Sequence, residues 1–228
     1  MSVKSIFSAA LLLGIPAGPA LAEDARLAYR QLYNIQKAEA EWNRTHTNLV
    51  VVMLMQSTLP TVKTSDLSAA IDSRSGKMPL VIGPAGDFVV PMRDELLAEN
   101  PWILVNQPKG TMKLSWQMGV VSGPITNTVH YARLMQPVRD SEDVQEQMRQ
   151  ILPNSPKMIM TGLKLTFSAE QKKAKATIHA RDGDRKLKAD EHGEIIVPLI
   201  TDLLDEDPAI SLSDVPIALT IVSRPSAR

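Results

Sequence analysis

A stretch of eighteen residues in the first half of the chain recurs 107 residues later, and this internal match constrains the fold more than any other feature. Residues 86–103, GDFVVPMRDELLAENPWI, align without a gap to residues 193–210, GEIIVPLITDLLDEDPAI. Eight of the eighteen positions are identical, whereas an unrelated pair would share about one. A period above 100 residues is too long for a solenoid repeat, so the match predicts a duplicated domain.

The start of each copy is marked by a shorter match. The pattern Tyr-x-x-Leu occurs at residues 29–32 and again at residues 131–134, an offset of 102. We therefore predict repeat domain 1 at residues 23–124 and repeat domain 2 at residues 125–228, each close to the commonest domain size. The boundary falls at Ser122-Gly123-Pro124, which is typical of a turn.

The first 22 residues have the organisation of a secretory signal peptide. Lys4 supplies the positive charge, residues 6–15 form a short apolar run, and Ala20-Leu21-Ala22 is a cleavage signal before Glu23. The apolar run is too short to span a bilayer, and the chain has no cysteine for a lipid anchor. We expect cleavage between Ala22 and Glu23 and a periplasmic or secreted protein without an integral membrane segment.

Charge and cysteine content exclude several classes of function. The 25 basic and 25 acidic residues balance, so the chain lacks the strongly basic surface that nucleic-acid binding requires. The absence of cysteine excludes disulfides, thiol catalysis and thiolate metal sites. The chain must therefore be stabilised by packing alone, and we expect no nucleic-acid partner.

Each copy is predicted to contain a helix followed by strands. In the first copy Asp24 is a candidate N-cap for an apolar stripe that ends at Trp42, and in the second copy Pro137 interrupts a helix that restarts near Asp140. Apolar runs or period-two alternation predict strands at residues 49–55, 112–118, 163–167, 174–180 and 217–221. The expected fold is mainly β with packed helices (α+β), built as two tandem repeated β-sandwich-like domains, each preceded by a helix.

The repeated segment itself predicts a strand, a short helix and a second strand. A glycine opens the first strand, and a proline ends it. Two leucines of the short helix face the core. The residue that precedes the second proline is pushed out of the right-handed helical region, which ends the helix and starts the second strand. We assign this motif a structural role. Its residues are Gly86, Pro91, Leu96, Leu97, Pro101, Gly193, Pro198, Leu203, Leu204 and Pro208.

The hairpin-like stretch from Asp190 to Pro198, DEHGEIIVP, resembles the hairpins of immunoglobulin-like and transthyretin-like sandwiches in exported bacterial proteins. It is also similar to exported bacterial families of unknown function. The resemblance implies a β-sandwich fold and no functional residues. The cysteine and tryptophan markers of true immunoglobulin domains are absent.

The sequence contains no recognisable catalytic or cofactor motif. The four histidines lie apart from one another and outside any metal-binding pattern, and nucleophile elbows, phosphate loops and dinucleotide fingerprints are missing. Two Met-x-Met pairs, at residues 53–55 and 158–160, could ligate copper, but both lie in apolar segments where methionine ordinarily fills the core. We therefore predict no catalytic residues, no cofactor and no metal ligands.

Three functional hypotheses follow from these patterns. The first is a non-catalytic exported module that binds or assembles with another envelope protein through its sheet edges or the groove between its copies. The second is a binder of a small ligand or metal at an interdomain cleft, with contributions from Trp102, Trp116, His130 and Tyr131. The third is a hydrolase that uses carboxylates scattered over the sequence.

Overall fold

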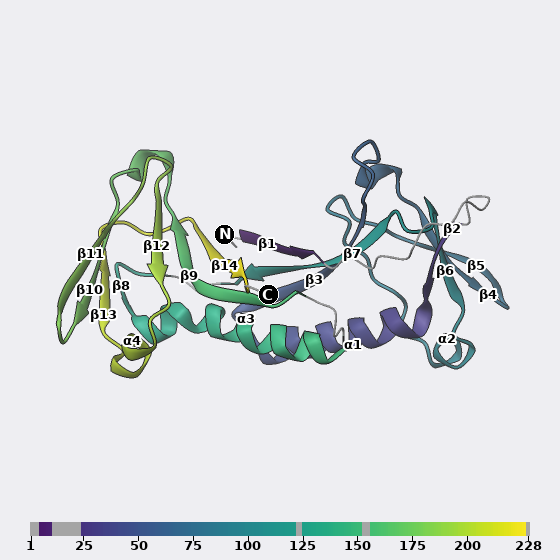
Figure 1. Ribbon diagram of the computed structural model, residues 1–228, viewed down its shortest axis with the longest axis horizontal. Helices are drawn as coiled ribbons and strands as arrows, with labels where there is room; N and C mark the ends of the chain where they lie inside the picture. Colours follow the sequence, from purple (N-terminus) through teal and green to yellow (C-terminus); the bar gives the residue numbers. More distant parts are fainter. Residues whose placement is uncertain (1–4, 11–23, 122–124, 152–155, 227–228) are drawn as a thin grey trace. The chain divides into compact units, whose positions relative to one another are not determined.

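The computed structural model describes residues 24–121, 125–151 and 156–226, together with the backbone of residues 5–10 (Figure 1). The described residues are mainly β and include four α-helices, which confirms the predicted mainly-β α+β class. The cleavage site at Ala22 and Glu23 and the boundary at Ser122–Pro124 lie outside the described residues, and both stay predictions.

The chain divides into two compact units. The N-terminal unit consists of residues 8–45 and 51–117, and the C-terminal unit consists of residues 1–7, 46–50 and 118–228. Residues 46–50 follow the first long helix and belong to the C-terminal unit, although their neighbours in sequence belong to the other.

The elements from β2 to β7 make up the first half of the chain. In order they are β2 (Asp24–Ala28), α1 (Tyr29–Thr45), β3 (Leu49–Ser57), the 3-10 helix η1 (Thr64–Asp66), β4 (Ala69–Ser73), β5 (Gly76–Leu80), α2 (Asp94–Glu99), β6 (Trp102–Pro108) and β7 (Met112–Val120). A further strand, β1 (Ser5–Ala10), joins a sheet of order β1-β7-β3.

The second half repeats this order of elements with one more strand. It contains β8 (Thr128–His130), α3 (Tyr131–Ile151), β9 (Met158–Thr166), η2 (Ala169–Gln171), β10 (Lys175–Ala180), β11 (Gly183–Lys188), β12 (Glu194–Pro198), α4 (Thr201–Glu206), β13 (Ala209–Leu212) and β14 (Ala218–Pro225). In the first half the segment that corresponds to β12 forms only isolated bridges, Leu54 with Asp87 and Ile82 with Phe88.

Each unit contains a four-stranded antiparallel sheet, and the two sheets have the same order and register. The order is β2-β6-β4-β5 in the N-terminal unit and β8-β13-β10-β11 in the C-terminal unit. Ile71 pairs with Ile103 and Met78, and the residues 107 positions later, Ile178 with Ile210 and Arg185, pair in the same way. A second sheet of the C-terminal unit has the order β12-β9-β14.

Apolar side chains from the long helices and the inner sheet faces form the cores. The predicted stripe of α1 is buried at Leu32, Ile35 and Trp42, and the Trp42 ring packs edge-on against Trp116 at 5.6 Å between centroids. Burial of such large side chains contributes roughly 2–3 kcal/mol each, so these stripes supply much of the stability of a chain that has no disulfide.

Two expectations about the helices are wrong. Asp24 does not cap α1, because residues 24–28 form β2, which pairs with β6, and the helix begins only at Tyr29. Pro137 does not interrupt the second helix, since α3 runs without a break from Tyr131 to Ile151. Pro137 lies buried within α3, and we infer that its packing outweighs the one helical hydrogen bond that proline removes.

The paired leucines of the motif do not both face the core. Leu96 and Leu203 are buried, whereas Leu97 and Leu204 are only half-buried. Adjacent residues on a helix point about 100° apart, so a single turn packed on one core can bury only one of them.

A buried tyrosine at the start of each long helix binds the motif at both of its ends. The Tyr131 hydroxyl donates to the Pro198 carbonyl at 2.5 Å and accepts from the Ile200 N–H at 2.8 Å, and the Tyr131 N–H donates to Pro208 at 2.9 Å. In the first half, Tyr29 makes the same three contacts, to Pro91, Arg93 and Pro101. We call these two sets of contacts the tyrosine clamps.

The residue after each short helix has a left-handed backbone conformation, and its side chain binds the long helix next to the clamp tyrosine. Asn100 has φ 51° and Asp207 has φ 47°. The side chain of Asn100 accepts from the Arg30 N–H at 2.9 Å, and that of Asp207 accepts from the Ala132 N–H at 2.8 Å. Asparagine and aspartate tolerate this conformation better than most residues, and here they cap the first turn of the long helix.

We predict that loss of a clamp hydroxyl destabilises the protein. Tyr29→Phe and Tyr131→Phe should each lower the free energy of unfolding by about 1–2 kcal/mol, because two hydrogen bonds to half-buried backbone groups are lost. Tyr33→Phe is the matched control, since its hydroxyl has no bond among the described residues. Urea unfolding of the three variants checks this, and equal effects at all three positions would contradict it.

Candidate functional site

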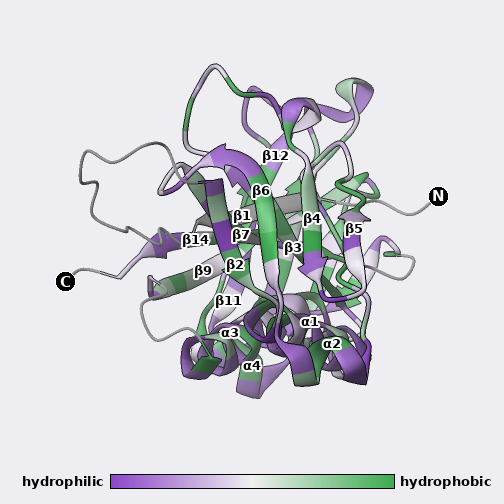
Figure 2. Cartoon of the chain, turned by 90° about the vertical axis from the view of Figure 1, so that its right-hand side faces the viewer, coloured by the Kyte–Doolittle hydropathy of each residue, from purple (hydrophilic) through white to green (hydrophobic). Residues whose placement is uncertain are grey.

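The outer face of the N-terminal four-stranded sheet exposes a tryptophan. Alternation along β6 buries Ile103 and Val105 and turns Trp102 outward, where it is 51% exposed. Figure 2 looks onto this sheet, with β6 and β4 at the front. A half-exposed tryptophan on a regular sheet is unusual, because burial of its large apolar surface is normally favourable.

The neighbours of Trp102 give this face an apolar centre and a polar rim. The cross-strand partners of Trp102 are Ala28 on β2 and Asp72 on β4, and the next row places Leu104 between Arg26 and Ala70. The partners of Asp72 and Ala70 on β5 are Lys77 and Pro79. We call the residues Arg26, Ala28, Ala70, Asp72, Lys77, Pro79, Trp102 and Leu104 the tryptophan face.

The same face of the C-terminal sheet has different chemistry. The residues 107 positions after Trp102, Leu104 and Ala70 are Ala209, Ser211 and Thr177. Lysines stand at 175, 186 and 188, all of them exposed. We call the residues Lys175, Thr177, His179, Asp184, Lys186, Lys188, Ala209 and Ser211 the lysine face.

Three side chains of the lysine face form a hydrogen-bonded chain. His179 Nδ1 lies 2.9 Å from Asp184 Oδ1, and His179 Nε2 lies 2.9 Å from Ser211 Oγ. This order of serine, histidine and carboxylate is the one that activates a serine nucleophile in hydrolases. Here the side chains of His179 and Asp184 are 43% and 49% exposed. Ser211 lies on a strand paired on both sides, so its backbone groups belong to the sheet and are not free to bind an oxyanion.

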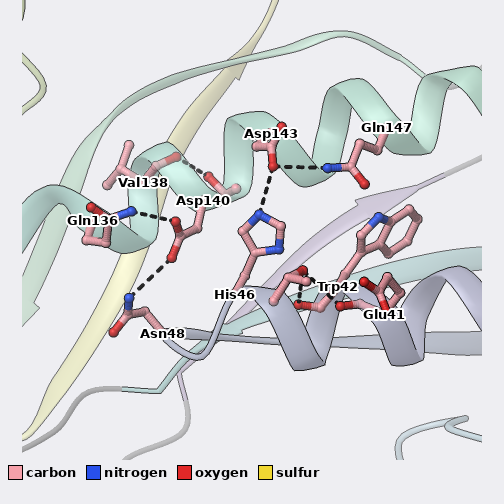
Figure 3. A network of polar contacts seen from close by, with 11 residues as sticks. Glu41, Trp42, His46, Asn48, Gln136, Val138, Asp140, Asp143 and Gln147 are labelled. Carbon is pink, nitrogen blue, oxygen red and sulfur yellow. Dashed lines mark hydrogen bonds and ion pairs between the residues drawn. The ribbon is translucent and has the colours of Figure 1, made fainter.

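A second polar cluster lies within the C-terminal unit, around the buried carboxylate of Asp140 on α3 (Figure 3). Asp140 accepts hydrogen bonds from Gln136 at 2.6 Å and from Asn48 at 3.3 Å. One turn further along α3, Asp143 lies 2.8 Å from His46 Nε2. The cluster therefore ties residues 46–48 to α3, and every polar side chain named here has a partner.

A small pocket lies beside this cluster. Its volume is about 90 Å³, and its lining includes Asn48, Thr128, Arg133, Pro137 and Leu219. Pockets for drug-sized ligands have volumes of about 300–1,000 Å³. This pocket has room for a few water molecules.

The residues predicted for a ligand site are not brought together as one. Trp116 is 3% exposed and packs in the N-terminal core against Trp42, and Tyr131 is fully buried as a clamp residue. His130 is exposed and lies 3.1 Å from the carbonyl oxygen of Asp207. Of the predicted set, Trp102 alone is a large exposed aromatic side chain.

The motif residues occupy backbone positions that the fold requires. Gly86 has φ 92°, and a Cβ atom there would lie 2.5 Å from the Met55 carbonyl oxygen. The backbone N–H of Met55 donates a hydrogen bond to the Gly86 carbonyl oxygen. Pro91 and Pro198 supply the carbonyl groups that the clamp tyrosines bind. Gly86, Pro91 and Pro198 thus make specific backbone contacts, and the structural role of the whole motif stays a prediction.

The described residues include neither a cluster of metal ligands nor a helix that could span a membrane. No group of three or more His, Cys, Asp or Glu side chains among the described residues could hold a metal ion. Met53, Met55 and Met160 are buried in the core. No helix in the described ranges is long and apolar enough to cross a membrane.

Sequence reasoning missed the two sheet faces because it predicted a strand after Pro101 but did not identify β4 and β5. These strands are short, and β5 contains a proline, so alternation in a single strand is weak. The internal match could have found β4, since the strand predicted at residues 174–180 lies 107 positions after residues 67–73. Transfer of that predicted strand onto residues 67–73 would have placed β4 beside the strand that follows Pro101.

Comparisons of the chain with protein-family models, with curated proteins and with solved structures found no significant match.

One carboxyl group in the N-terminal unit has a strongly altered acidity. Burial raises the pKa of Glu39 on α1 from 4.5 to about 7, and a hydrogen bond from the Met53 backbone offsets part of the effect. Glu39 lies one turn from Gln36 and Asn43, whose side chains bind the backbone of Val90 and Val51. The side chains of Gln36, Glu39 and Asn43 thus form hydrogen bonds with backbone groups of Val90, Met53 and Val51.

Glu39 makes stability depend on pH. Because its folded pKa is raised, the folded state binds more protons than the unfolded state between pH 4.5 and about 7, so stability falls as pH rises through this range. We predict that Glu39→Gln has little effect at pH 4.5 and stabilises the protein at pH 8 by on the order of 3 kcal/mol. Urea unfolding at both pH values measures this.

The control is Glu41→Gln on the same helix, where the carboxylate is exposed and paired with Arg44. This variant should show no stabilisation at pH 8. A Glu39→Gln variant with the same pH dependence as the wild type would rule out Glu39 as the titrating group.

Proposed function

We propose that this protein is an exported, non-catalytic binding module that docks a partner protein of the cell envelope on its tryptophan face. Trp102 supports this proposal most strongly, because it lies half-exposed at the start of β6, an inner strand of an open sheet. Trp and Arg are the residues most enriched among the side chains that dominate binding energy, and an apolar centre inside a polar rim is the usual anatomy of an interface.

We also infer that the two halves are copies of one β-sandwich-like domain with an associated helix. The support is the shared order of elements, the common register of the two sheets and the two tyrosine clamps, each of which follows the offsets found in the sequence. Equivalent positions can then be compared directly. Because Ala209 occupies the position of Trp102 in the second copy, the domain does not need tryptophan there in order to fold.

The composition of the edge strands β5 and β11 disfavours strand addition at those two edges and favours a sheet face as the binding surface. β5 carries Pro79, which cannot donate to an added strand. β11 carries Arg185, Lys186 and Lys188, and charges of this kind discourage pairing with another chain. The proposed partner therefore contacts side chains, with apolar groups against Trp102 and Leu104 and acidic groups near Arg26 and Lys77.

Crosslinking in the native envelope tests the proposal. A photoreactive amino acid at position 70, beside Leu104, should give one discrete adduct, and the same amino acid at the matched position 177 should give none. Once the partner is purified, Trp102→Ala should weaken binding about tenfold or more in calorimetry.

Ile196→Ala is the control variant, because it removes an equally exposed apolar side chain from the C-terminal unit. It should bind the partner like the wild type. Equal affinity of Trp102→Ala and wild type, with both proteins folded, would overturn the proposed site.

The non-catalytic part of the proposal has its own test. We infer that the chain of Ser211, His179 and Asp184 is a cross-strand polar pairing, because it lies open to water and offers no free backbone donor for an oxyanion. A fluorophosphonate probe, which forms a covalent bond to activated serines, should leave the mature protein unlabelled. Labelling that disappears in Ser211→Ala and persists in Ser213→Ala would show that the site is catalytic.

A further inference from the structure

The lysine face of the C-terminal unit carries three ammonium groups that have no partner within the described part of the chain. Lys175, Lys186 and Lys188 are exposed, and none forms an ion pair with an acidic group among the described residues. Asp184, which binds His179, is the one carboxylate among the residues of the lysine face, so the three lysines outnumber it. The face therefore has a local positive charge in a chain whose net charge is zero.

The arrangement of these lysines is costly for the fold. Lys175 and Lys188 are direct cross-strand partners, and Lys186 is the partner of the next outward residue, Thr177. Like charges directly opposite on one sheet face destabilise the pairing. The N-terminal unit has Ser68, Pro79 and Val81 at the positions 107 residues earlier, so the first half folds without charge there.

Hydroxyl groups lie beside the lysines on the same face. Thr177 and Ser211 are cross-strand partners, and Thr128 on β8 is the next partner of Ser211. Lys172 and Lys173, both exposed, precede β10 and extend the charge beyond the sheet. Ammonium and hydroxyl donors spread over an open sheet suit several phosphate groups presented together, because a single small anion could touch only part of the face.

We propose that the lysine face binds the phosphate groups of anionic phospholipids, so that the protein associates with a membrane surface without inserting into it. The inference does not rest on the tryptophan face, which belongs to the other unit. Each lysine near an anionic membrane strengthens binding roughly fivefold, so three lysines contribute roughly a hundredfold.

Vesicle sedimentation tests this proposal. The mature chain, residues 23–228, should sediment with vesicles that contain phosphatidylglycerol and should stay in solution with pure phosphatidylcholine vesicles. Binding should fall steeply between 50 and 200 mM salt, because exposed charges are screened. The triple variant K175Q/K186Q/K188Q should lose roughly a hundredfold in affinity and should melt no lower than the wild type, since the substitutions remove a repulsion.

A charge-matched control separates this face from net charge. The variant K37Q/K63Q/K157Q removes three exposed lysines elsewhere and should bind the vesicles like the wild type. Inorganic phosphate at millimolar concentration should compete only weakly, because it occupies one donor group at a time. Equal loss in both triple variants, equal binding to neutral vesicles, saturable binding of free phosphate alone, or binding to a DNA duplex in place of vesicles would each overturn the proposal.

Discussion

Each half of this protein is organised around one buried tyrosine hydroxyl. The hydroxyl binds a proline carbonyl and an amide N–H at the start of the short helix, and the tyrosine N–H binds the carbonyl of a second proline after it. The long helix is thereby held against both ends of the motif, and the strand that follows is positioned in the four-stranded sheet. Both sheet faces depend on this arrangement, because β6 and β13 begin directly after the clamped prolines.

The clamp explains why the motif is the best-matched part of the two halves. Pro91 and Pro198 offer carbonyl groups to a tyrosine, while Asn100 and Asp207 cap a helix from a left-handed conformation. These backbone contacts and conformations restrict which residue types can occupy the four positions. The outward positions of the sheets carry no such constraint, and there the two halves differ most: an indole and aliphatic groups on one face, and lysines and hydroxyls on the other.

Local sequence patterns were sufficient for the elements that bury many apolar residues. The buried strand β3 and the alternation in β7, β9 and β10 predicted strands where they occur, and the stripe of α1 predicted its buried face. Patterns failed where tertiary contacts decide the outcome. The sequence pattern predicts a helix cap at Asp24, but this residue pairs with β6. It predicts a helix break at Pro137, but this residue is buried inside α3. The candidate faces escaped notice because exposure of Trp102 depends on the register of three short strands.

We propose that one scaffold carries two surfaces and that the outward side chains alone decide what each surface binds. Exchange of outward residues between the halves tests it most directly, in the variant W102A/L104S/A209W/S211L with a photoreactive amino acid at position 70 or 177. We expect a folded protein with a nearly unchanged melting temperature, whose envelope adduct disappears from position 70 and forms at position 177. An adduct that stays at position 70, or a variant that no longer folds, would contradict it.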